Sequence, residues 1–304
     1  MSTPYDFRVG IDLGGTKTEI AALAPDGTLL HRHRVPTPHG YHDSVAGMAD
    51  MVRAIEQKMG GRASVGIGIP GVISPATGLV KNANTIALNG HPFDTEISVL
   101  LGREVRVEND ANCFALSEAT DGAGAGQRLV FGVILGTGCG GGIVFDGTVI
   151  RGRHHIAGEW GHTPLPWPRA EEIPGPLCWC GHHNCLELHI SGTGLAMDCD
   201  GPDARDAHSI PARAAAGEAR AQAALLRHAD KLARGFAVII NLIDPDVIVL
   251  GGGLSNLEHL YTEIPRLMAP YVFSDFVHTP IVKNKHGDSS GVRGAAWLWP
   301  APEK

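Results

Sequence analysis

The chain has 304 residues, of which 43% are hydrophobic and 19% charged, with a formal net charge of −7. This composition is that of a globular protein with enough apolar side chains for two cores. The acidic balance argues against a nucleic-acid partner, because phosphate binding normally needs a basic face. No apolar run approaches the roughly 20 residues of a membrane span, and the first residues lack a signal peptide's apolar core. We therefore expect a cytoplasmic protein that does not enter a membrane.

The first third of the chain predicts strands around a glycine-rich turn, followed by alternating helices and strands. Hydrophobic alternation and turn residues mark the boundaries. The predicted strands are 7–13 (FRVGIDL), 18–23 (TEIAAL), one from Thr28, 63–70 and 104–107, and the predicted helices are 43–59 and one from Asn109 or Asp110. The turn between the first two strands is GGTK, residues 14–17.

The same pattern returns in the second part of the chain. LVFGVIL (129–135) precedes the turn GTGCGG (136–141), and two strands separated by an Asp-Gly turn follow. The other predicted elements are strands at 142–145 and 148–150, a helix at about 217–242, a buried parallel strand in DPDVIVLGGG (244–253), and helices at 256–269 and 291–299. The repeat predicts an α/β protein with two duplicated domains, 1–120 and 121–290, and a cleft between them.

The first glycine loop suits phosphate. Its backbone N–H groups are open to phosphate oxygens, and Thr16 and Lys17 add donors. Asp12 lies within the apolar strand just before the loop, where a carboxylate is too costly to bury without a partner, and a hydrated magnesium ion would suit it. The alternative is a tight hairpin with a hydrogen-bonded Asp12. The Walker spacing is absent.

The second glycine loop contains G-x-G-x-x-G at Gly136, Gly138 and Gly141. A dinucleotide-binding turn would lead into a helix, whereas GIVFDGTVI predicts a strand and a hairpin turn, so we reject that interpretation. A third glycine run, Gly251 to Gly253, lies at a strand's carboxyl end, where open α/β sheets bind ligands. The three loops together favour a nucleotide site more strongly than any one alone.

Asn109 and Asp110 stand between a short strand and an amphipathic helix. One interpretation is a helix N-cap followed by an acidic first turn, which is common. The other makes Asp110 a general base that takes the proton from an attacking hydroxyl. Both interpretations fit the sequence.

A cysteine cluster predicts a metal site. Cys178, Cys180 and Cys185 fall within eight positions, and GEWGH (158–162) adds a histidine. Three thiols and one imidazole make a closed tetrahedral zinc set, which is structural. Spacing alone does not choose the histidine, because four others compete with His162: His154, His155, His182 and His183. Folding around the metal would bring two neighbouring carboxylates, Glu159 and Glu187, to one pocket that suits hydroxyl-rich ligands.

Taken together, these motifs resemble the ROK family of bacterial sugar kinases and sugar-responsive repressors, in the actin-like ATPase (ribonuclease H-like) superfamily. The resemblance covers essentially the whole chain. It rests on DLGGTK, IPG (69–71), END (108–110), LGTGCGGG (135–142), GEWGH, CxCGxxxCxE (178–187) and DPDVIVLGGG.

The resemblance implies a role for each motif. Asp110 would be the catalytic base, and zinc would be held by His162, Cys178, Cys180 and Cys185. The sugar hydroxyls would be held by Asn84, Asn109, Asp110, Glu159, His162 and Glu187. ATP with Mg²⁺ would be held by Asp12, Gly14, Gly15, Thr16, Lys17, Gly136, Thr137, Gly138, Cys139, Gly140, Gly141, Gly252 and Gly253. A C-terminal helix at about 291–304 would complete the first domain, and the family's tendency to dimerise implies a homodimer.

The substrate is expected to be a hexose. KNANTIALNGHPFD (81–94), GHTPLPWP (161–168) and KHGDSSGVRGAAWLW (285–299) resemble the fructokinase, or mannokinase, branch. We therefore expect fructose to be phosphorylated at its 6-hydroxyl, the more so because the sequence offers no apolar partner for an N-acetyl methyl group. N-acetylglucosamine and glucose are the alternatives. A sugar-sensing repressor is the alternative of another class, but the first loop starts at Gly10, which leaves no room for a preceding DNA-binding domain.

Overall fold

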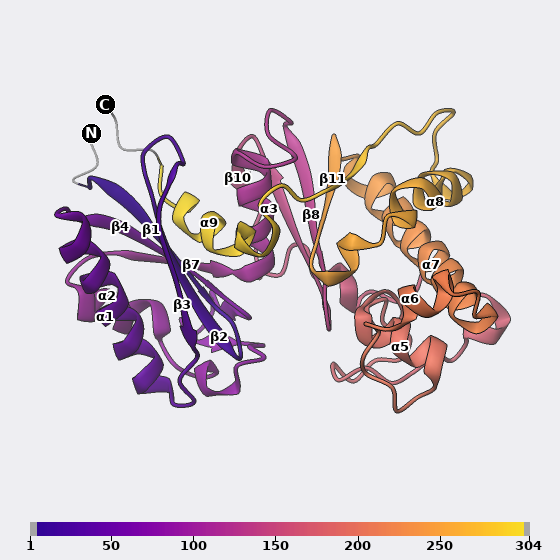
Figure 1. Ribbon diagram of the computed structural model, residues 1–304, viewed down its shortest axis with the longest axis horizontal. Coiled ribbons are helices and arrows are strands. Elements are labelled where there is room, and N and C mark those ends of the chain that lie inside the picture. Colours follow the sequence, from indigo (N-terminus) through magenta and orange to yellow (C-terminus); the bar gives the residue numbers. More distant parts are fainter. Residues whose placement is uncertain (1–4, 301–304) are drawn as a thin grey trace.

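Two five-stranded sheets stand side by side in the computed structural model, which describes residues 5–300 (Figure 1). The first sheet has the order β3-β2-β1-β4-β7 and the second β10-β9-β8-β11-β12. The strands of the first are β1 (Phe7–Leu13), β2 (Lys17–Leu23), β3 (Leu29–Pro36), β4 (Ala63–Ile69) and β7 (Val105–Asn109). Those of the second are β8 (Leu129–Leu135), β9 (Cys139–Phe145), β10 (Thr148–Val149), β11 (Val247–Gly251) and β12 (Ile281–Lys283).

Both sheets repeat one topology. Their first three strands run antiparallel as a meander, the fourth pairs parallel to the other side of the first, and the fifth pairs parallel to the fourth. In strand number within each half the order is 3-2-1-4-5 both times. The duplication predicted from the two strand-turn-strand segments is therefore present in the fold.

Two helices lie between the sheets: α3 (Asp110–Thr120) and α9 (Ser290–Trp297) (Figure 1). Paired glycines let them approach. Gly10 and Gly66 face each other on β1 and β4, and a Cβ on either would lie within 2 Å of a carbonyl oxygen of α9. Gly132 and Gly142 are paired in the same way on β8 and β9, where a Cβ would lie 2.7 and 2.6 Å from atoms of α3. Because these glycines have no side chain, α9 and α3 can pack directly against the backbone of the two sheets.

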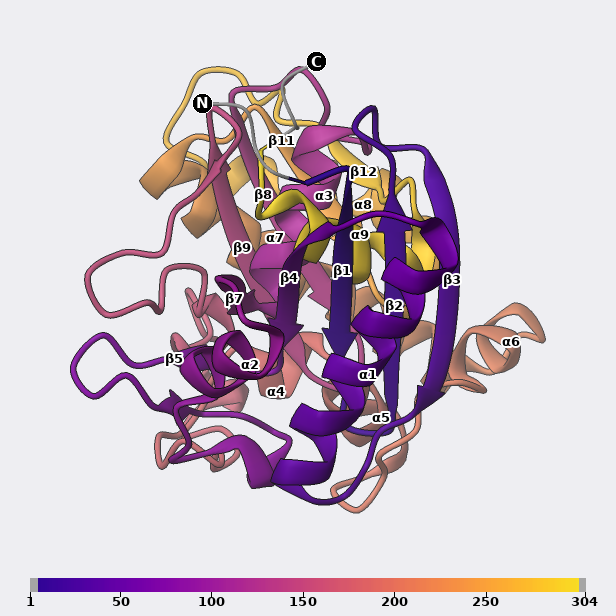
Figure 2. The ribbon, with the colours of Figure 1, turned by 90° about the vertical axis from the view of Figure 1, so that its left-hand side faces the viewer.

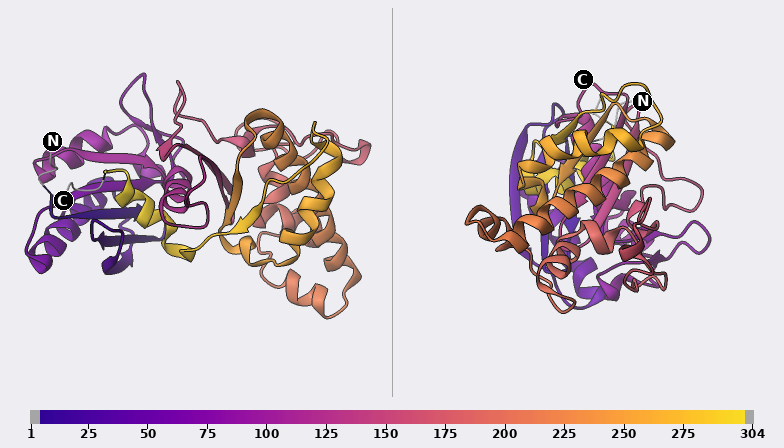
Figure 3. Two further views of the ribbon diagram at one scale, coloured as in Figure 1. Left: turned by 90° about the horizontal axis from the view of Figure 1, so that it is seen from above. Right: turned by 90° about the vertical axis from the view of Figure 1, so that its right-hand side faces the viewer.

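The outer faces are covered by separate helices. Figure 2 shows α1 (Tyr41–Met59) in front of the first sheet, with α2 (Phe93–Leu101) beside it. Figure 3 shows α7 (Ala219–Ile243) and α8 (His259–Met268) on the far side of the second sheet. The remaining elements are β5 (Val72–Ile73), β6 (Val80–Lys81), η1 (Ile86–Leu88), η2 (Trp160–His162), η3 (Ala170–Glu172), α4 (Glu187–Ile190), α5 (Gly192–Asp200), α6 (Ile210–Ala215), η4 (Gly253–Asn256), η5 (Ala269–Tyr271) and η6 (Gly287–Ser289).

Strand faces explain which residues point toward the middle. On β1 the odd-numbered Val9 and Ile11 join the core under α1, so the alternation turns Gly10 and Asp12 toward α9. On β8, Phe131 and Val133 join the core under α7, while Val130 packs with α3. The inner faces of both sheets therefore meet the helix pair, and Asp12 lies there.

The packing of α3 bears on where the two halves meet. Helix α3 falls within our first domain, 1–120, yet Phe114, Ala115 and Leu116 share a core with the second sheet. By packing, the chain passes between the halves at Asn109–Asp110. Residues 1–4 and 301–304, which we included with the first domain, lie outside the described residues. The division itself stays a prediction. No helix within 5–300 is both long and apolar enough to cross a bilayer.

Candidate active site

The first glycine loop is a tight turn whose tip is exposed. The Gly14 N–H donates to the Lys17 carbonyl oxygen at 3.0 Å, and the Thr37 hydroxyl donates to the Gly14 carbonyl oxygen at 2.7 Å. Lys17 already begins β2. No hydrogen bond reaches the Asp12 carboxylate from any residue in 5–300, so this inward-facing acid has free oxygens, as a hydrated magnesium site requires.

Asn109 and Asp110 serve as helix cap and as candidate base at the same time. The Asn109 side-chain oxygen accepts from the N–H groups of Ala111 and Asn112 at 2.9 and 3.2 Å, which confirms the N-cap interpretation. Its amide nitrogen donates to Asp110 Oδ1 at 3.0 Å. Cap and acid are therefore held as one unit at the crossing between the halves.

Burial raises the pKa values of three acids of this region, Asp12, Asp110 and Glu159. Burial raises the pKa of Asp12 to about 7, and the negative charge of Asp110 adds to the shift. Burial also raises the pKa of Asp110 to about 6; a hydrogen bond from the Ala111 backbone opposes this, and the charge of Glu159 adds to it. Asp12, Asp110 and Glu159 therefore lie close enough to repel one another. A site that needs a cation and a base has this character.

Glu187 joins the second glycine loop to the cysteine cluster. One of its oxygens accepts from the Cys139 N–H at 2.9 Å, and the other from the Trp179 indole at 3.3 Å. A Cβ on Gly138 would lie 2.9 Å from the same carboxylate. The predicted sugar-binding carboxylate is thus held beside the second loop.

The second loop is shorter than predicted. Cys139, Gly140 and Gly141 belong to β9 and pair with β8, so only Gly136–Gly138 form the turn. Glycines extend the strand here because α3 leaves no room for side chains: a Cβ on Gly140 would lie 2.9 Å from Ala111. The prediction was too long because it assigned every glycine of the run to the turn.

The third glycine run lies against the second loop. Gly252 has φ +77°, and a Cβ there would lie 2.5 Å from the Leu135 carbonyl oxygen, immediately before Gly136. Gly253 has open space around it. The two loops of the second half therefore form one surface. No hydrogen bond joins them to the loop at 14–17 within residues 5–300.

Asn84 is exposed and is placed by the IPG turn. Its N–H donates to the Pro70 carbonyl oxygen at 3.0 Å, and the Asn109 amide donates to the Gly71 carbonyl oxygen at 3.4 Å. One turn thus anchors both predicted sugar-binding asparagines.

The four predicted metal ligands come together. Ligand atoms of His162, Cys178, Cys180 and Cys185 all lie within 4.8 Å of one another. His162 Nδ1 is 3.7 Å from Cys178 Sγ, and the Cys180 and Cys185 sulfurs are 3.5 Å apart. Spacings of this size suit a tetrahedral zinc with bonds of about 2.0–2.3 Å. The structure also separates His162 from the competing histidines, which lie outside the cluster within 5–300.

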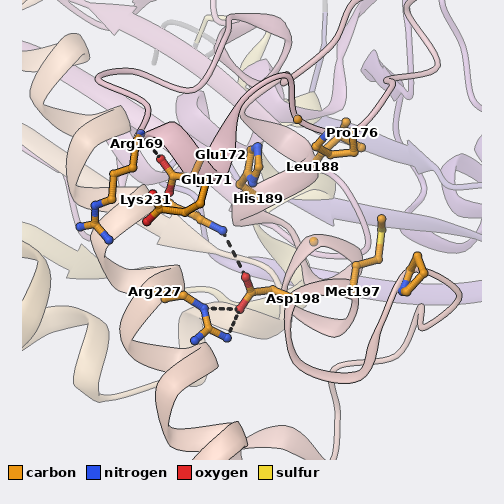
Figure 4. A pocket seen from close by; sticks show the side chains of 13 residues that line it. Arg169, Glu171, Glu172, Pro176, Leu188, His189, Met197, Asp198, Arg227 and Lys231 are labelled. Atoms are coloured by element: carbon orange, nitrogen blue, oxygen red, sulfur yellow. Dashed lines mark hydrogen bonds and ion pairs between the residues drawn. The ribbon is translucent and has the colours of Figure 1, made fainter.

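A hollow lined by charged side chains lies away from these residues. It has a volume of about 370 Å³ and lies among α4, α5, α7 and residues 169–176 (Figure 4). Arg227 and Lys231 line it, and both contact Asp198, at 2.8 and 3.3 Å. Since these cations share a carboxylate, the hollow offers little free positive charge for a phosphate.

A smaller cavity adjoins Asn109. It has a volume of about 160 Å³. Its wall consists of Val72, Ile73, Asp94, Val105, Val107, Glu108, Asn109, Arg151 and His155. The valines supply an apolar surface beside a predicted sugar-binding residue, which the sequence did not reveal.

Two residues that hydrogen-bond to the predicted site, Trp179 and Glu108, were not identified from the sequence. Trp179 donates to Glu187, but its place between two cysteines shows only that it belongs to the metal loop. Glu108 precedes Asn109 and is buried beneath it. A carboxylate directly after a predicted strand was the available signal, since such a group needs partners if it is buried.

The architecture defines the class of protein: two 3-2-1-4-5 sheets around a helix pair make the actin-like ATPase fold. Two solved structures share it over 96% of this chain. A ROK hexokinase from Thermus thermophilus is 30% identical, with a TM-score of 0.85 over 97% of its own chain. A ROK family glucokinase from Streptomyces griseus, in complex with glucose and AMPPNP, is 28% identical, with a TM-score of 0.78 over 98% of its chain.

The family model for ROK matches residues 8–301. A protein from Yersinia enterocolitica named N-acetyl-D-glucosamine kinase is 40% identical over 296 residues, covering 95% of this chain and 98% of its own. The chain therefore belongs to the ROK family and is a sugar kinase. The fructokinase branch that we expected finds no specific support in these comparisons, whereas the N-acetylglucosamine alternative does.

Proposed function

We propose that this protein is an ATP-dependent N-acetylglucosamine kinase that phosphorylates the sugar's 6-hydroxyl. The observation that carries the proposal is the 40% identity, over almost the whole of both chains, to a protein of that name. The site geometry supports the reaction, because a carboxylate with a pKa of about 6 suits a general base near neutral pH.

The chemistry is divided among the predicted residues. Asp110 takes the proton of the attacking hydroxyl, while Asn84, Asn109, Glu159, His162 and Glu187 hold the sugar. The glycine loops at 14–17, 136–138 and 252–253 hold the phosphates. Magnesium, when bound, neutralises phosphate charge, and Asp12 is the residue that would orient its hydration shell. His162 would use Nδ1 for zinc, which leaves Nε2 for the sugar or a neighbouring acid.

The cavity beside Asn109 supports an acetamido sugar. A methyl group needs an apolar partner, and Val72 and Val107 lie in the cavity wall. Burial of one methyl-sized group is worth roughly 1 kcal/mol, enough for a several-fold preference. This removes the physical objection that the sequence raised against N-acetylglucosamine.

The test is kcat/KM by coupled ADP release for N-acetylglucosamine, glucose, mannose and fructose. We expect N-acetylglucosamine to be the best substrate. Val107→Phe would fill the cavity and lower kcat/KM for N-acetylglucosamine by about tenfold relative to glucose. Faster turnover of any other sugar by the wild type would contradict the proposal.

A further inference from the structure

A buried carboxylate lies directly behind the candidate base. Glu108 ends the inner face of β7, one residue before Asn109, and is 8% exposed. One of its oxygens accepts from the Asn109 N–H at 2.9 Å and from the Asn112 side chain at 3.0 Å. The same two residues connect to Asp110: Asn109 donates to its carboxylate, and Asn112 lies in the next turn of α3. Glu108 therefore holds the segment that carries the base.

The charged partner of Glu108 comes from the other half of the molecule. Arg151, which follows β10, donates through Nε to the second oxygen of Glu108. The Arg151 side chain makes no other hydrogen bond or ion pair within residues 5–300, while its backbone carbonyl oxygen accepts from the Ala157 N–H at 3.2 Å. After Arg151 the chain continues to Gly158 and Glu159. The contact between Arg151 and Glu108 is therefore connected through the backbone to a predicted sugar-binding residue.

The segment after Arg151 touches the first half twice more. His155 Nδ1 is 3.1 Å from the Ile73 carbonyl oxygen, and Lys81 donates to the His154 carbonyl oxygen at 3.4 Å. Residues 151–155 thus form a strap that follows β10 of the second sheet and contacts β7, β5 and β6 of the first half. Of its contacts, Arg151 with Glu108 is the one that joins opposite charges.

We propose that Glu108 and Arg151 are positioning residues for phosphoryl transfer, joining the two halves and thereby fixing Asn109 and the base Asp110. The proposal rests on the function proposed above. If the strap moved away, Glu108 would keep only neutral hydrogen-bond donors, which do not offset the cost of burying its charge. The side chain would then move toward solvent. Glu108 would then release Asn109 and Asn112, and the base would lose its alignment with the hydroxyl.

The burial of Glu108 separates this pair from an ordinary surface ion pair. Exposed pairs are typically worth less than about 1 kcal/mol and seldom affect activity. The chain contains a matched example in Arg128 and Asp146, whose side chains are 71% and 52% exposed. In the proposed pair the arginine is 47% exposed but the glutamate only 6%. Removing the arginine should therefore matter in one pair and not in the other.

The experiment compares Arg151→Met with the control Arg128→Met in the full-length protein. We expect Arg151→Met to lower kcat about 10- to 100-fold, because small misplacements of reacting groups have effects of that size. The KM for ATP should stay within about twofold, since the nucleotide loops lie elsewhere. Arg151→Lys, which keeps the charge, should recover part of the loss. Arg128→Met should leave both constants unchanged.

A double variant guards against simple destabilisation. If Glu108 and Arg151 act through one link, Glu108→Gln with Arg151→Met should be no slower than Arg151→Met alone. Fully additive losses, or a kcat for Arg151→Met within about twofold of the wild type, would overturn the inference. A wild type inactive on every sugar would contradict the proposed function instead, so the two failures are distinguishable.

Discussion

The first strands of the two halves have the same length and align without a gap, and they differ at the position of the candidate magnesium-binding acid. β1 reads FRVGIDL and β8 reads LVFGVIL, so that Gly10 corresponds to Gly132 and Asp12 to Ile134. Both glycines face the helix pair, and the next inward position holds an acid in the first half and an apolar side chain in the second. At this strand position the shared scaffold thus carries a carboxylate in the first half only. The duplication explains the packing, and the departure from it marks the candidate magnesium side.

The second half departs in its own way after β10. There the chain makes the strap at 151–155 and the loop that holds the cysteine cluster before α4 begins, whereas the first half turns directly from β3 into α1. Glu187, at the start of α4, accepts from β9 and from Trp179 of that loop. The first half thus supplies the inward-facing Asp12, and the second half supplies the loop that holds Glu187, a predicted sugar-binding residue.

Asp110→Asn should have the largest effect on activity, because it removes the proposed base at the crossing between the halves. The amide keeps the size of the side chain, so α3 should remain intact. We expect kcat to fall by roughly 10²–10⁴ while nucleotide binding is retained. Steady-state kinetics and ATP titration check this, with Asp146→Asn as the control on an exposed acid. A turnover close to normal would place the base elsewhere.

Disrupting the cysteine cluster should have the next largest effect, confined at first to the second half. If the cluster holds structural zinc, the purified protein should contain about one zinc per chain, and Cys185→Ser should lose it. Loss of the metal that joins His162 to the cysteine loop should lower Tm by several degrees. Cys199→Ala, a buried thiol outside the cluster, should keep its zinc. Metal analysis without zinc in the wild type would contradict the assignment.

The sequence revealed strands and motifs better than the contacts between them. Alternation and turns predicted β1, β2, β8 and β11 closely, because those strands are largely apolar and are bounded by glycine or by a Pro-Asp-Gly turn. The short β12 has only three residues and no such pattern. The role of α3 between the sheets was also hidden, since an amphipathic pattern does not say which sheet covers its apolar face. For the same reason Arg151 gave no sign that it reaches Glu108, 43 positions earlier.

Alanine at the inward glycines should compare the two helix-sheet contacts directly. A Cβ on Gly10 would lie 1.9 Å from the Val292 carbonyl oxygen, whereas one on Gly132 would lie 2.7 Å from Ala115. The first conflict is with backbone and is much tighter. We expect Gly10→Ala to lower the free energy of unfolding by about 3 kcal/mol and Gly132→Ala by about 1–2 kcal/mol. Equal losses in denaturant unfolding would show that both contacts relax alike.

The smallest effect should come from removing the acid of β1, Asp12, whose counterpart on β8 is Ile134. Asp12→Asn keeps the shape of the side chain and takes away its charge. In the wild type, burial and the charges of Asp110 and Glu19 raise the pKa of Asp12 from 3.8 to about 7. Such a group stabilises the fold when protonated, and this contribution is lost as the pH rises through about 7. At pH 8 without magnesium, Asp12→Asn should therefore be more stable than the wild type.

The size of this gain in stability, and its dependence on pH, show whether the charge of Asp12 is its cause. The full shift corresponds to about 4 kcal/mol, but the carboxyl is only partly buried, so screening should leave about 1–2 kcal/mol. The difference should shrink as the pH falls from 8 to 5, because the wild type then binds the proton that relieves it. Magnesium with nucleotide should also reduce it at pH 8, by supplying the missing positive charge. Urea unfolding at both pH values, with and without magnesium and nucleotide, measures this. A variant less stable than the wild type at pH 8 would mean that Asp12 already has its partner within the protein, and the magnesium assignment would fail with it.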